Sequence, residues 1–263
     1  MSSRLTDLLR RLTSRLTRSW VFRRRLPAEF GGTPVWVSPG AALAYLRPLD
    51  QPGWRELHEF ARHCVAPGDV VWDVGANLGI FGFCAAHRAG PGGQVVVIEA
   101  DPWLAALLNR SAAIPAPRAP VAVICAAAAD RVGLLEFAIT SRTRAGSHLT
   151  AVPGAGDELV GATRQIQTVV AITLDWLLER RPAPQVVKLD VEGAELMVLR
   201  GGRELLRRHR PKLLLEVHAH AAAEISLLLR EEGYELYQFG NGWAGRHPIE
   251  LATYHTLALP KAP

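Results

Sequence analysis

The sequence predicts an α/β protein of the Rossmann-like type, with a seven-stranded, mostly parallel sheet and helices on both faces. From Val70 onward, short runs rich in β-branched residues alternate with helical stretches. The first run ends in a glycine-containing turn that opens a helix, and acidic residues follow two of the later runs. Since the carboxyl ends of parallel strands meet at one edge of a sheet, these features should converge on one crevice.

The chain of 263 residues is long enough for one catalytic domain with an N-terminal extension. We expect a basic amphipathic helix or tail over residues 1–30 and a small β-hairpin extension over residues 31–56. The Rossmann-like domain should then occupy residues 57–263.

The N-terminal segment carries leucines at helical spacing with arginines between them. This pattern predicts a basic amphipathic helix. One hypothesis is that residues 1–25 adsorb to an anionic membrane surface, with Trp20 and Phe22 at the interface. The alternative is a helix that docks on its own domain, or a partly ordered tail.

The positive charge of the chain is concentrated at its N-terminus. Residues 1–25 hold eight arginines and one acid, a net +7, whereas the whole chain has a net charge of +5, so the remainder carries −2. A nucleic-acid enzyme usually has a basic face on its folded body. We therefore expect no nucleic-acid partner.

The cysteines and the hydropathy indicate the compartment. Cys64, Cys84 and Cys125 are odd in number and widely spaced, so we expect neither zinc nor disulfides but small core residues. No uncharged apolar run approaches the roughly 20 residues of a membrane-spanning helix, and no signal peptide is evident. These observations favour a cytoplasmic protein, and the hypothesis for the N-terminus adds a peripheral location at the membrane surface.

The elements follow in order along the chain. Val35–Val37 and Leu43–Leu46, separated by Pro39 and Gly40, predict the hairpin, and residues 54–64 predict a helix. The seven strands of the main sheet are expected at Val70–Val74, Gln94–Ile98, Val121–Cys125, Val186–Asp190, Lys212–Val217, Tyr234–Phe239 and Thr253–Leu259.

Residues 141–165 have little periodicity and are rich in Gly, Ser, Thr and Arg. A loop of this length in a compact domain often has a function, so we expect a substrate lid here, with Ser147-His148 as possible contacts of the acceptor. An insertion without a role is the alternative.

The strongest local motif is the strand ending in Asp73, followed by the turn Gly75-Ala76-Asn77-Leu78-Gly79. The glycines allow a tight turn and close approach of a ligand, and the helix amides then face that ligand. Glu99 ends the next strand, 24 residues after Gly75, where an acid should reach ribose hydroxyls. Ile80 stands where a dinucleotide motif has its third glycine, which disfavours a nicotinamide or flavin cofactor.

Further acids lie at later strand ends. Lys188-Leu189-Asp190-Val191-Glu192-Gly193-Ala194-Glu195 places Asp190 and Glu192 at the carboxyl edge of the sheet. Leu215-Glu216-Val217-His218 brings Glu216 and His218 to the adjoining strand end, and alternation puts them on one side.

Together these three motifs resemble the FkbM family of methyltransferases, and the resemblance covers residues 57–240. It implies the seven-stranded class I methyltransferase fold, S-adenosylmethionine as methyl donor, and O-methylation of a saccharide or secondary metabolite. Carried over by position, Asp73 and the loop from Gly75 through Asn77 to Gly79 would hold the methionine part of the donor. Glu99 would hold its ribose, and Ala126 and Ala127 would line its adenine.

The methyl group of such a donor is already activated, so the protein must mainly align the acceptor and exclude water. His218 is the first candidate for the base that takes the hydroxyl proton, and Glu192 is the second. Asp190, Glu192, Glu216 and His218 could alternatively bind a divalent cation, but no recognised metal motif is present. In the opposing interpretation Glu192 and Glu195 stabilise a helix N-terminus, and Lys188 pairs with one of them.

Two other classes of function stay open at this point: a NAD-type oxidoreductase, and a non-catalytic, membrane-associated binding module. His148 and His220 are expected to lie at the surface or in packing contacts. The sequence does not define the oligomeric state or the acceptor.

Overall fold

The computed structural model describes residues 13, 16–141, 143–152 and 163–261. Most of the expected N-terminal amphipathic helix lies outside the described residues. None of the helices in the described ranges is long and apolar enough to cross a membrane.

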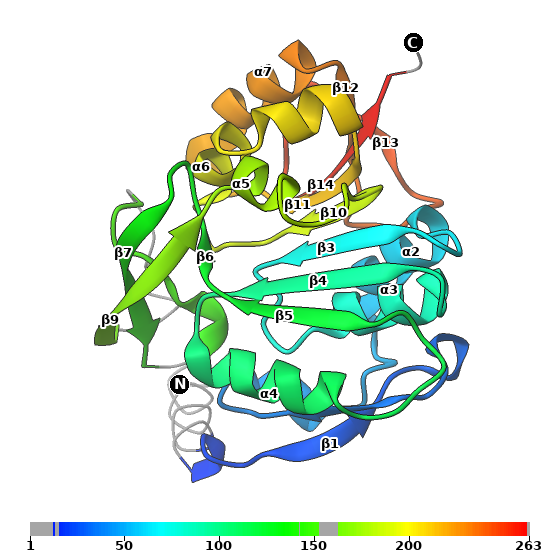
Figure 1. The fold of residues 1–263 in the computed structure, drawn as a ribbon, viewed down its shortest axis with the longest axis vertical. Coiled ribbons are helices and arrows are strands. Elements are labelled where there is room, and N and C mark those ends of the chain that lie inside the picture. Colours follow the sequence, from blue (N-terminus) through cyan, green and yellow to red (C-terminus); the bar gives the residue numbers. More distant parts are fainter. Residues whose placement is uncertain (1–12, 14–15, 142, 153–162, 262–263) are drawn as a thin grey trace, which may run out of the picture.

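The main sheet has eight strands in the order β13-β12-β14-β11-β10-β3-β4-β5 (Figure 1). Four neighbouring pairs, from β11 through β10, β3 and β4 to β5, are parallel, whereas β14 is antiparallel to both β11 and β12. The strands are β3 (Val70–Val74), β4 (Gln94–Glu99), β5 (Val121–Cys125), β10 (Val186–Leu189), β11 (Lys212–Glu216), β12 (Tyr234–Gln238), β13 (His247–Pro248) and β14 (His255–Pro260). All seven predicted strands are therefore present, and the short edge strand β13 is additional.

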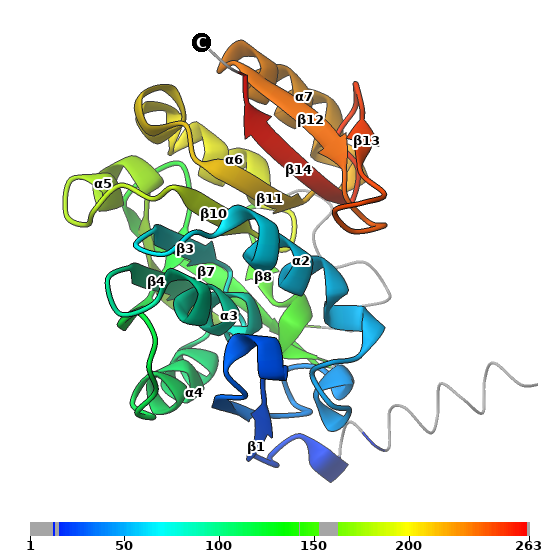
Figure 2. The ribbon, with the colours of Figure 1, turned by 90° about the vertical axis from the view of Figure 1, so that its right-hand side faces the viewer.

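Helices cover both faces of this sheet, as Figure 2 shows. One face packs on α2 (Arg55–Cys64), α3 (Ile80–Ala89) and α4 (Pro102–Ala112). The other face packs on α5 (Leu174–Leu178), α6 (Glu195–Arg200), the π-helical turn η5 (Leu205–His209) and α7 (Ala222–Glu231). Alternate residues of each strand point into the two cores, so that Val71 belongs to the first and Trp72 to the second.

The N-terminal extension differs from its prediction. The hairpin of Val35–Val37 with Leu43–Leu46 is wrong: β2 (Pro34–Val37) pairs with β1 (Phe22–Arg25). Leu43–Leu46 forms the 3-10 helix η2, and short 3-10 turns η1 (Ala28–Phe30) and η3 (Pro52–Trp54) flank it. Phe30, Val35 and Tyr45 are buried in the same core as α2 and α3, so the extension is continuous with the main domain.

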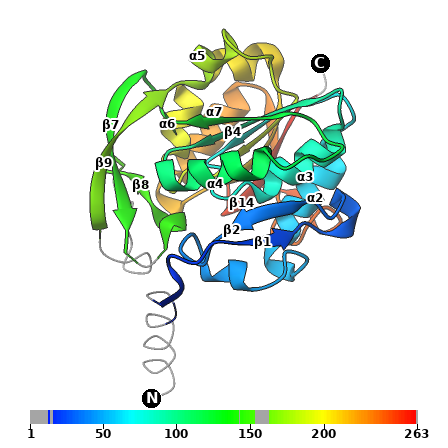
Figure 3. The same cartoon turned by 60° about the horizontal axis from the view of Figure 1, so that its bottom comes forward.

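A second, four-stranded sheet was not predicted. It has the order β6-β9-β7-β8 and stands at one side of the main sheet (Figure 3). Its strands are β6 (Ala127–Ala128), β7 (Gly133–Thr140), β8 (His148–Leu149) and β9 (Thr163–Ile172). Its own core, with Phe137, Leu149 and Ala171, also includes Ala194 from the turn before α6. The sheet thus flanks the carboxyl edge of the main sheet.

Two shorter details complete the fold. The 3-10 turns η4 (Arg144–Gly146) and η6 (Ala219–Ala221) lie before β8 and α7. Cys64 and Cys84 are buried as expected, but Cys125 is exposed because it ends β5 at the sheet edge, so the prediction of a core residue was wrong there.

Candidate active site

The turn between β3 and α3 is a tight loop built around Gly75. Gly75 has φ +71°, and a Cβ placed on it would lie 1.7 Å from the carbonyl oxygen of Asp190, so no other residue fits there. Asn77 also has positive φ, and the amides of Gly75 and Ala76 donate to the carbonyl of Ile98. The turn therefore brings the ends of β3, β4 and β10 into direct contact.

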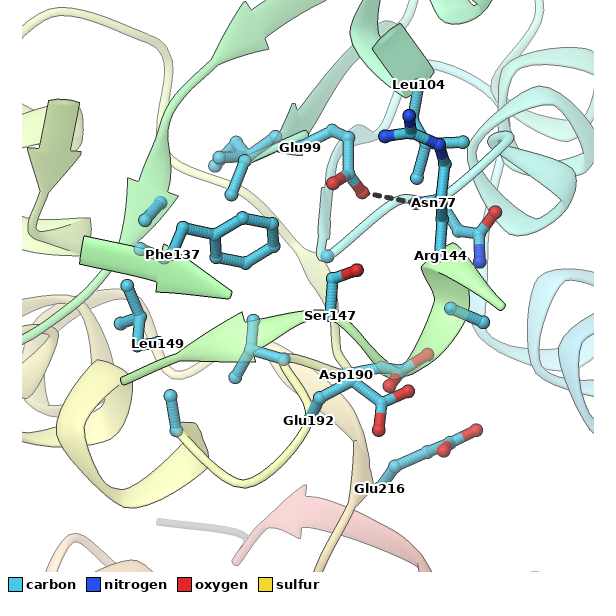
Figure 4. Close-up of a pocket in the computed structure, with 18 of the residues that line it drawn as sticks. Asn77, Glu99, Leu104, Phe137, Arg144, Ser147, Leu149, Asp190, Glu192 and Glu216 are labelled. Atoms are coloured by element: carbon cyan, nitrogen blue, oxygen red, sulfur yellow. Dashed lines mark hydrogen bonds between the residues drawn. The ribbon is translucent and has the colours of Figure 1, made fainter. Parts of the chain in front are cut away.

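Glu99 at the end of β4 is buried beside this turn. Its carboxylate accepts hydrogen bonds from the amides of Asn77 and Asp101, each at 2.8 Å, as the dashed line in Figure 4 shows for Asn77. Burial raises the pKa of Glu99 to about 7, against the opposing effect of these amides. The two backbone bonds hold the carboxylate in one orientation toward the space above the turn.

Lys188 anchors the centre of the site from within the sheet. Its Nζ donates to the carbonyl of Gly75 at 2.8 Å, lies 3.0 Å from Asp190 Oδ2 and lies 3.6 Å from Asp73 Oδ1. Burial alone would lower the pKa of Lys188, but Asp190 and Asp73 outweigh it and raise the pKa. The pairing of Lys188 with Glu192 or Glu195, which belonged to the opposing interpretation, is not formed, because its ammonium contacts Gly75, Asp190 and Asp73 instead.

Three carboxylates gather opposite Glu99, on Asp190, Glu192 and Glu216 (Figure 4). Burial is the main cause that raises the pKa of Asp190 to about 6, and burial together with Asp190 raises that of Glu192 to about 8. Burial would also raise the pKa of Glu216, but His255 and Tyr254 outweigh it and lower the pKa.

Glu195 stabilises the turn that carries these acids. Its Oε1 accepts from the amides of Val191 and Gly193, each at 3.1 Å, and the side chain is fully buried. Glu192 and Gly193 both have positive φ in this turn. Glu195 thus holds the backbone conformation that aims Glu192 at the site.

Glu99 and the carboxylates of Asp190, Glu192 and Glu216 line a first cavity of about 260 Å³ at the carboxyl edge of the main sheet. Its apolar wall includes Ile98, Leu104, Phe137 and Leu149, and the acids lie at its other end. A second cavity of about 190 Å³ lies on the α2 side, and it shares Asn77, Ala145, Asp190 and Glu216 with the first.

The structure brings most of the predicted site residues to the first cavity. Of the predicted site residues, those that line this cavity are Gly75, Asn77, Glu99, Ala126, Ala127, Asp190, Glu192 and Glu216. Asp73 and Gly79 do not. Asp73 is buried and accepts from the amide of Gly82 at 2.9 Å, and Gly79 caps α3 with φ +77°. Gly79 therefore shapes the loop from behind, whereas Asp73 holds the start of α3 and also lines the second cavity.

His218 is also absent from the lining of both cavities. Strand β11 ends at Glu216, so alternation does not extend to His218. Its Nδ1 lies 3.7 Å from Glu195 Oε2, and Glu195 is the main cause that raises the pKa of His218. The first candidate base thus lies behind the turn, beside a buried carboxylate.

Other lining residues were missed by sequence reasoning. Phe137, Arg144 and Tyr254 line the first cavity, and they come from β7, η4 and the turn before β14. No motif marks them, since they reach the site only through the second sheet and the antiparallel strand. Ser147 lines the cavity, as its location in the expected lid suggested, whereas His148 is buried within β8.

The described parts of the expected lid, residues 141–165, contain regular secondary structure. They include η4, β8 and the start of β9, while residues 142 and 153–162 lie outside the described ranges. Arg144 forms an ion pair with Asp101 and lies over the Trp103 ring, 4.8 Å from its centroid. The amides of Arg144 and Ala145 donate to the carbonyls of Gly40 and Ala41 at 3.1 and 3.0 Å.

Among the described residues, no group of three or more His, Cys, Asp or Glu side chains has a geometry that could hold a metal ion. The alternative of a divalent cation on the acid cluster and His218 therefore has no geometric support.

The strand order, the glycine turn and the cavity at the carboxyl edge define a class I methyltransferase fold. The model of the methyltransferase FkbM domain matches residues 73–236. The chain therefore belongs to the FkbM family of methyltransferases.

Two relatives match over most of the chain. The hexuronic acid methyltransferase AglP of Haloferax volcanii is 30% identical over 212 residues, 77% of this chain and 80% of that protein. The 31-O-demethyl-FK506 methyltransferase FkbM of Streptomyces tacrolimicus is 29% identical over 233 residues, 74% of this chain and 86% of that protein. Among solved structures, a methyltransferase FkbM from Methylobacillus flagellatus aligns with a TM-score of 0.43 at 15% identity, over 80% of this chain and 50% of that one.

Proposed function

We propose that the protein transfers a methyl group from S-adenosylmethionine to a hydroxyl oxygen of a small-molecule acceptor, either a saccharide or a secondary metabolite. The observation that carries this proposal is the first cavity, which has Glu99 at one end and the three acids Asp190, Glu192 and Glu216 at the other. The names of the two relatives, a hexuronic acid methyltransferase and a 31-O-demethyl-FK506 methyltransferase, agree with acceptors of these classes.

The lining of the first cavity suits such a donor in its chemistry. The Glu99 carboxylate is an acceptor for the two ribose hydroxyls, and Ala126, Ala127 and Phe137 offer an apolar surface for adenine. Gly75 and Asn77 line the part of the cavity where the methionine part would lie. The donor supplies a methyl group activated by a positively charged sulfonium. The carboxylates of Asp190 and Glu216, at the end of the cavity opposite Glu99, complement this positive charge.

Asp190 is the base that we assign to the reaction, in place of His218. It lines both cavities, and Lys188 holds its Oδ2 at 3.0 Å while the side chain stays 22% exposed. With a pKa of about 6 it is ionised at neutral pH, so it can accept the proton of a hydroxyl group placed between the cavities. Lys188 keeps the carboxylate oriented, and Glu216, whose pKa is lowered, adds negative charge beside it.

The test is calorimetric titration with S-adenosylhomocysteine of the wild type and of Glu99→Ala, with NAD as the competing ligand. We expect micromolar binding to the wild type, lost by at least about tenfold in Glu99→Ala because the ribose loses its acceptor. Glu179→Ala is the matched control, because Glu179 is exposed and outside both cavities. Absence of binding would overturn the proposal, and preference for NAD would replace it by an oxidoreductase.

The non-catalytic binding module is tested by turnover. A methyltransferase forms S-adenosylhomocysteine from the donor when acceptor is present, whereas a binding module leaves the donor intact. We further propose that the enzyme works in the cytoplasm, which agrees with three cysteines that form no disulfide.

A further inference from the structure

The second cavity lies beside the proposed base Asp190, and Glu99 is not among the residues that line it. It lies between the N-terminal extension, α2, and the ends of β3, β10 and β11. Asp190 and Glu216 line both cavities, so a group that fills the second cavity meets these carboxylates at the boundary with the first.

One wall of this cavity is aromatic. The rings of Tyr45 and Trp54 have centroids 5.0 Å apart at an interplanar angle of 34°, and both residues come from the extension. The Tyr45 hydroxyl lies 3.4 Å from Asn77 Oδ1, which ties this wall to the turn after β3. Such a surface can cover the apolar face of a ring while polar groups contact its rim.

The polar lining of this cavity is acidic. Its carboxyl groups are those of Glu56, Asp73, Asp190 and Glu216, and its bases are Lys188 and His255. Neither base is free, because Lys188 Nζ is bound to Gly75 and Asp190 while His255 Nε2 lies 3.6 Å from Glu216 Oε1. The described lining therefore offers hydrogen-bond acceptors for hydroxyl groups but no unpaired cation for a carboxylate.

We propose that the second cavity is the acceptor site, and that it selects a neutral or cationic polyhydroxylated ring over one that bears a carboxylate. This inference rests on the proposed methyl transfer, and it names the substrate class of the same site. Hydroxyl groups donate strong hydrogen bonds to carboxylates, whereas an anion beside Glu56, Asp190 and Glu216 meets like charges and finds no unpaired cation in the described lining. The acceptor preference of this chain would then differ from the one that the name of the hexuronic acid methyltransferase indicates for that protein.

The first arm of the experiment separates acceptor site from donor site. S-Adenosylhomocysteine is titrated into the full chain and into Trp54→Ala, which changes the second cavity alone. We expect affinities that agree within about twofold. A loss of about tenfold or more in Trp54→Ala would assign the cavity to the donor and overturn this inference, while the proposed function would stand. Failure of the wild type to bind would instead overturn the proposed function.

The second arm compares three acceptors that share one ring: methyl glucoside, methyl glucuronide and methyl glucosaminide. Transfer is measured as S-adenosylhomocysteine formed, and binding as saturation-transfer NMR with that product bound. We expect kcat/KM for the glucoside and the glucosaminide to exceed that for the glucuronide by at least about tenfold. Equal rates, preference for the glucuronide, or binding of none of the three overturns the inference.

Charge variants show whether Glu56 contributes to this selection. Glu56→Lys should narrow the ratio between glucoside and glucuronide several-fold, and Glu56→Gln should have an intermediate effect. Glu250→Lys makes the same charge change at an exposed position outside both cavities and should leave the ratio unchanged. If Glu250→Lys narrows the ratio as much as Glu56→Lys, long-range charge rather than this cavity sets the preference, and the inference fails.

Discussion

The carboxylate of Asp190 is held in one orientation and lines both cavities. Its orientation and its location depend on the neighbouring residues Lys188 and Gly75. Lys188 occupies one carboxylate oxygen, and the Gly75 turn packs directly against the carbonyl of Asp190. The sequence placed Asp190, Glu192 and Glu216 at the right edge because they follow buried strands. It ranked His218 above them by its ordinary pKa, since nothing local reveals that the chain leaves the strand at Glu216.

Asp190→Asn should lower kcat by about 10²- to 10⁴-fold, because an amide cannot accept the hydroxyl proton. With S-adenosylmethionine saturating, so that Glu99 does not contribute, kcat/KM for the acceptor should rise with pH through about 6 in the wild type, where Asp190 loses its proton, and the variant should lack this rise. Steady-state rates measured across a range of pH check the loss in kcat and the change in the pH profile. Asp130→Asn, at an exposed ion pair with Arg131, is the control. A variant with unchanged turnover that still binds S-adenosylhomocysteine would remove Asp190 from the mechanism.

Glu99 makes donor binding depend on pH in the opposite half of the site. Its pKa of about 7 in the free protein means that it is protonated below that pH, and ribose hydroxyls bind better to the ionised form. Affinity for S-adenosylhomocysteine should therefore weaken as pH falls below about 7, approaching tenfold per pH unit. Calorimetry on the wild type and Glu99→Gln checks this. The Gln variant should bind weakly at every pH, and a persisting slope would assign the titration to another group.

At the scale of elements, the strands with buried, β-branched runs could be predicted from the sequence. Strand β1 and the strands of the second sheet could not. The four β10 residues are all buried, and Val186, Val187 and Leu189 make the run apolar apart from the ion-paired Lys188. In β9, by contrast, Thr163, Arg164 and Gln165 are exposed and read as loop. In β1, three arginines follow Phe22 and read as a basic tail, although they pair with β2. In β1 and β9 alike, the residues form a strand because they pair with another strand, β2 or β7, and not because of their own sequence pattern.

The ion pair of Arg144 with Asp101 holds η4 against the first cavity. Removing the Arg144 side chain should destabilise this contact. Asp101 has a side chain only 1% exposed and would lose its charged partner. We expect Arg144→Ala to reduce the free energy of unfolding by about 2 kcal/mol and to weaken S-adenosylhomocysteine binding several-fold. Urea denaturation and calorimetry measure the two effects. Arg131→Ala, which breaks an exposed pair, should change stability by less than about 0.5 kcal/mol. Equal effects of the two variants would contradict this role for Arg144.

At the scale of the whole molecule, charge is divided between an N-terminal segment of net +7 and a remainder of −2. The segment is the part of the chain for which we retain the hypothesis of peripheral membrane contact. The folded remainder has no such excess of positive charge, and its acidic cavities fit small-molecule chemistry.

The membrane hypothesis predicts that the full chain floats with vesicles containing about 30% anionic lipid and not with neutral vesicles. Replacing Arg4, Arg10 and Arg11 by Glu should abolish flotation while donor binding is retained. The control replaces three exposed arginines elsewhere, Arg131, Arg180 and Arg208. Loss of flotation in both triple variants would indicate a general charge effect, and flotation of neither the wild type nor the control would reject membrane contact.

The position of β14 has a consequence for synthesis on the ribosome. This strand lies between β11 and β12, although it follows both of them in the chain. The nascent chain must therefore leave a gap in the sheet until His255–Pro260 has emerged from the exit tunnel. Tyr254 and His255, which line the two cavities, arrive with the same segment. Ribosome-bound chains that stop before this point should remain protease-sensitive and without donor affinity, because the domain completes its folding as a unit.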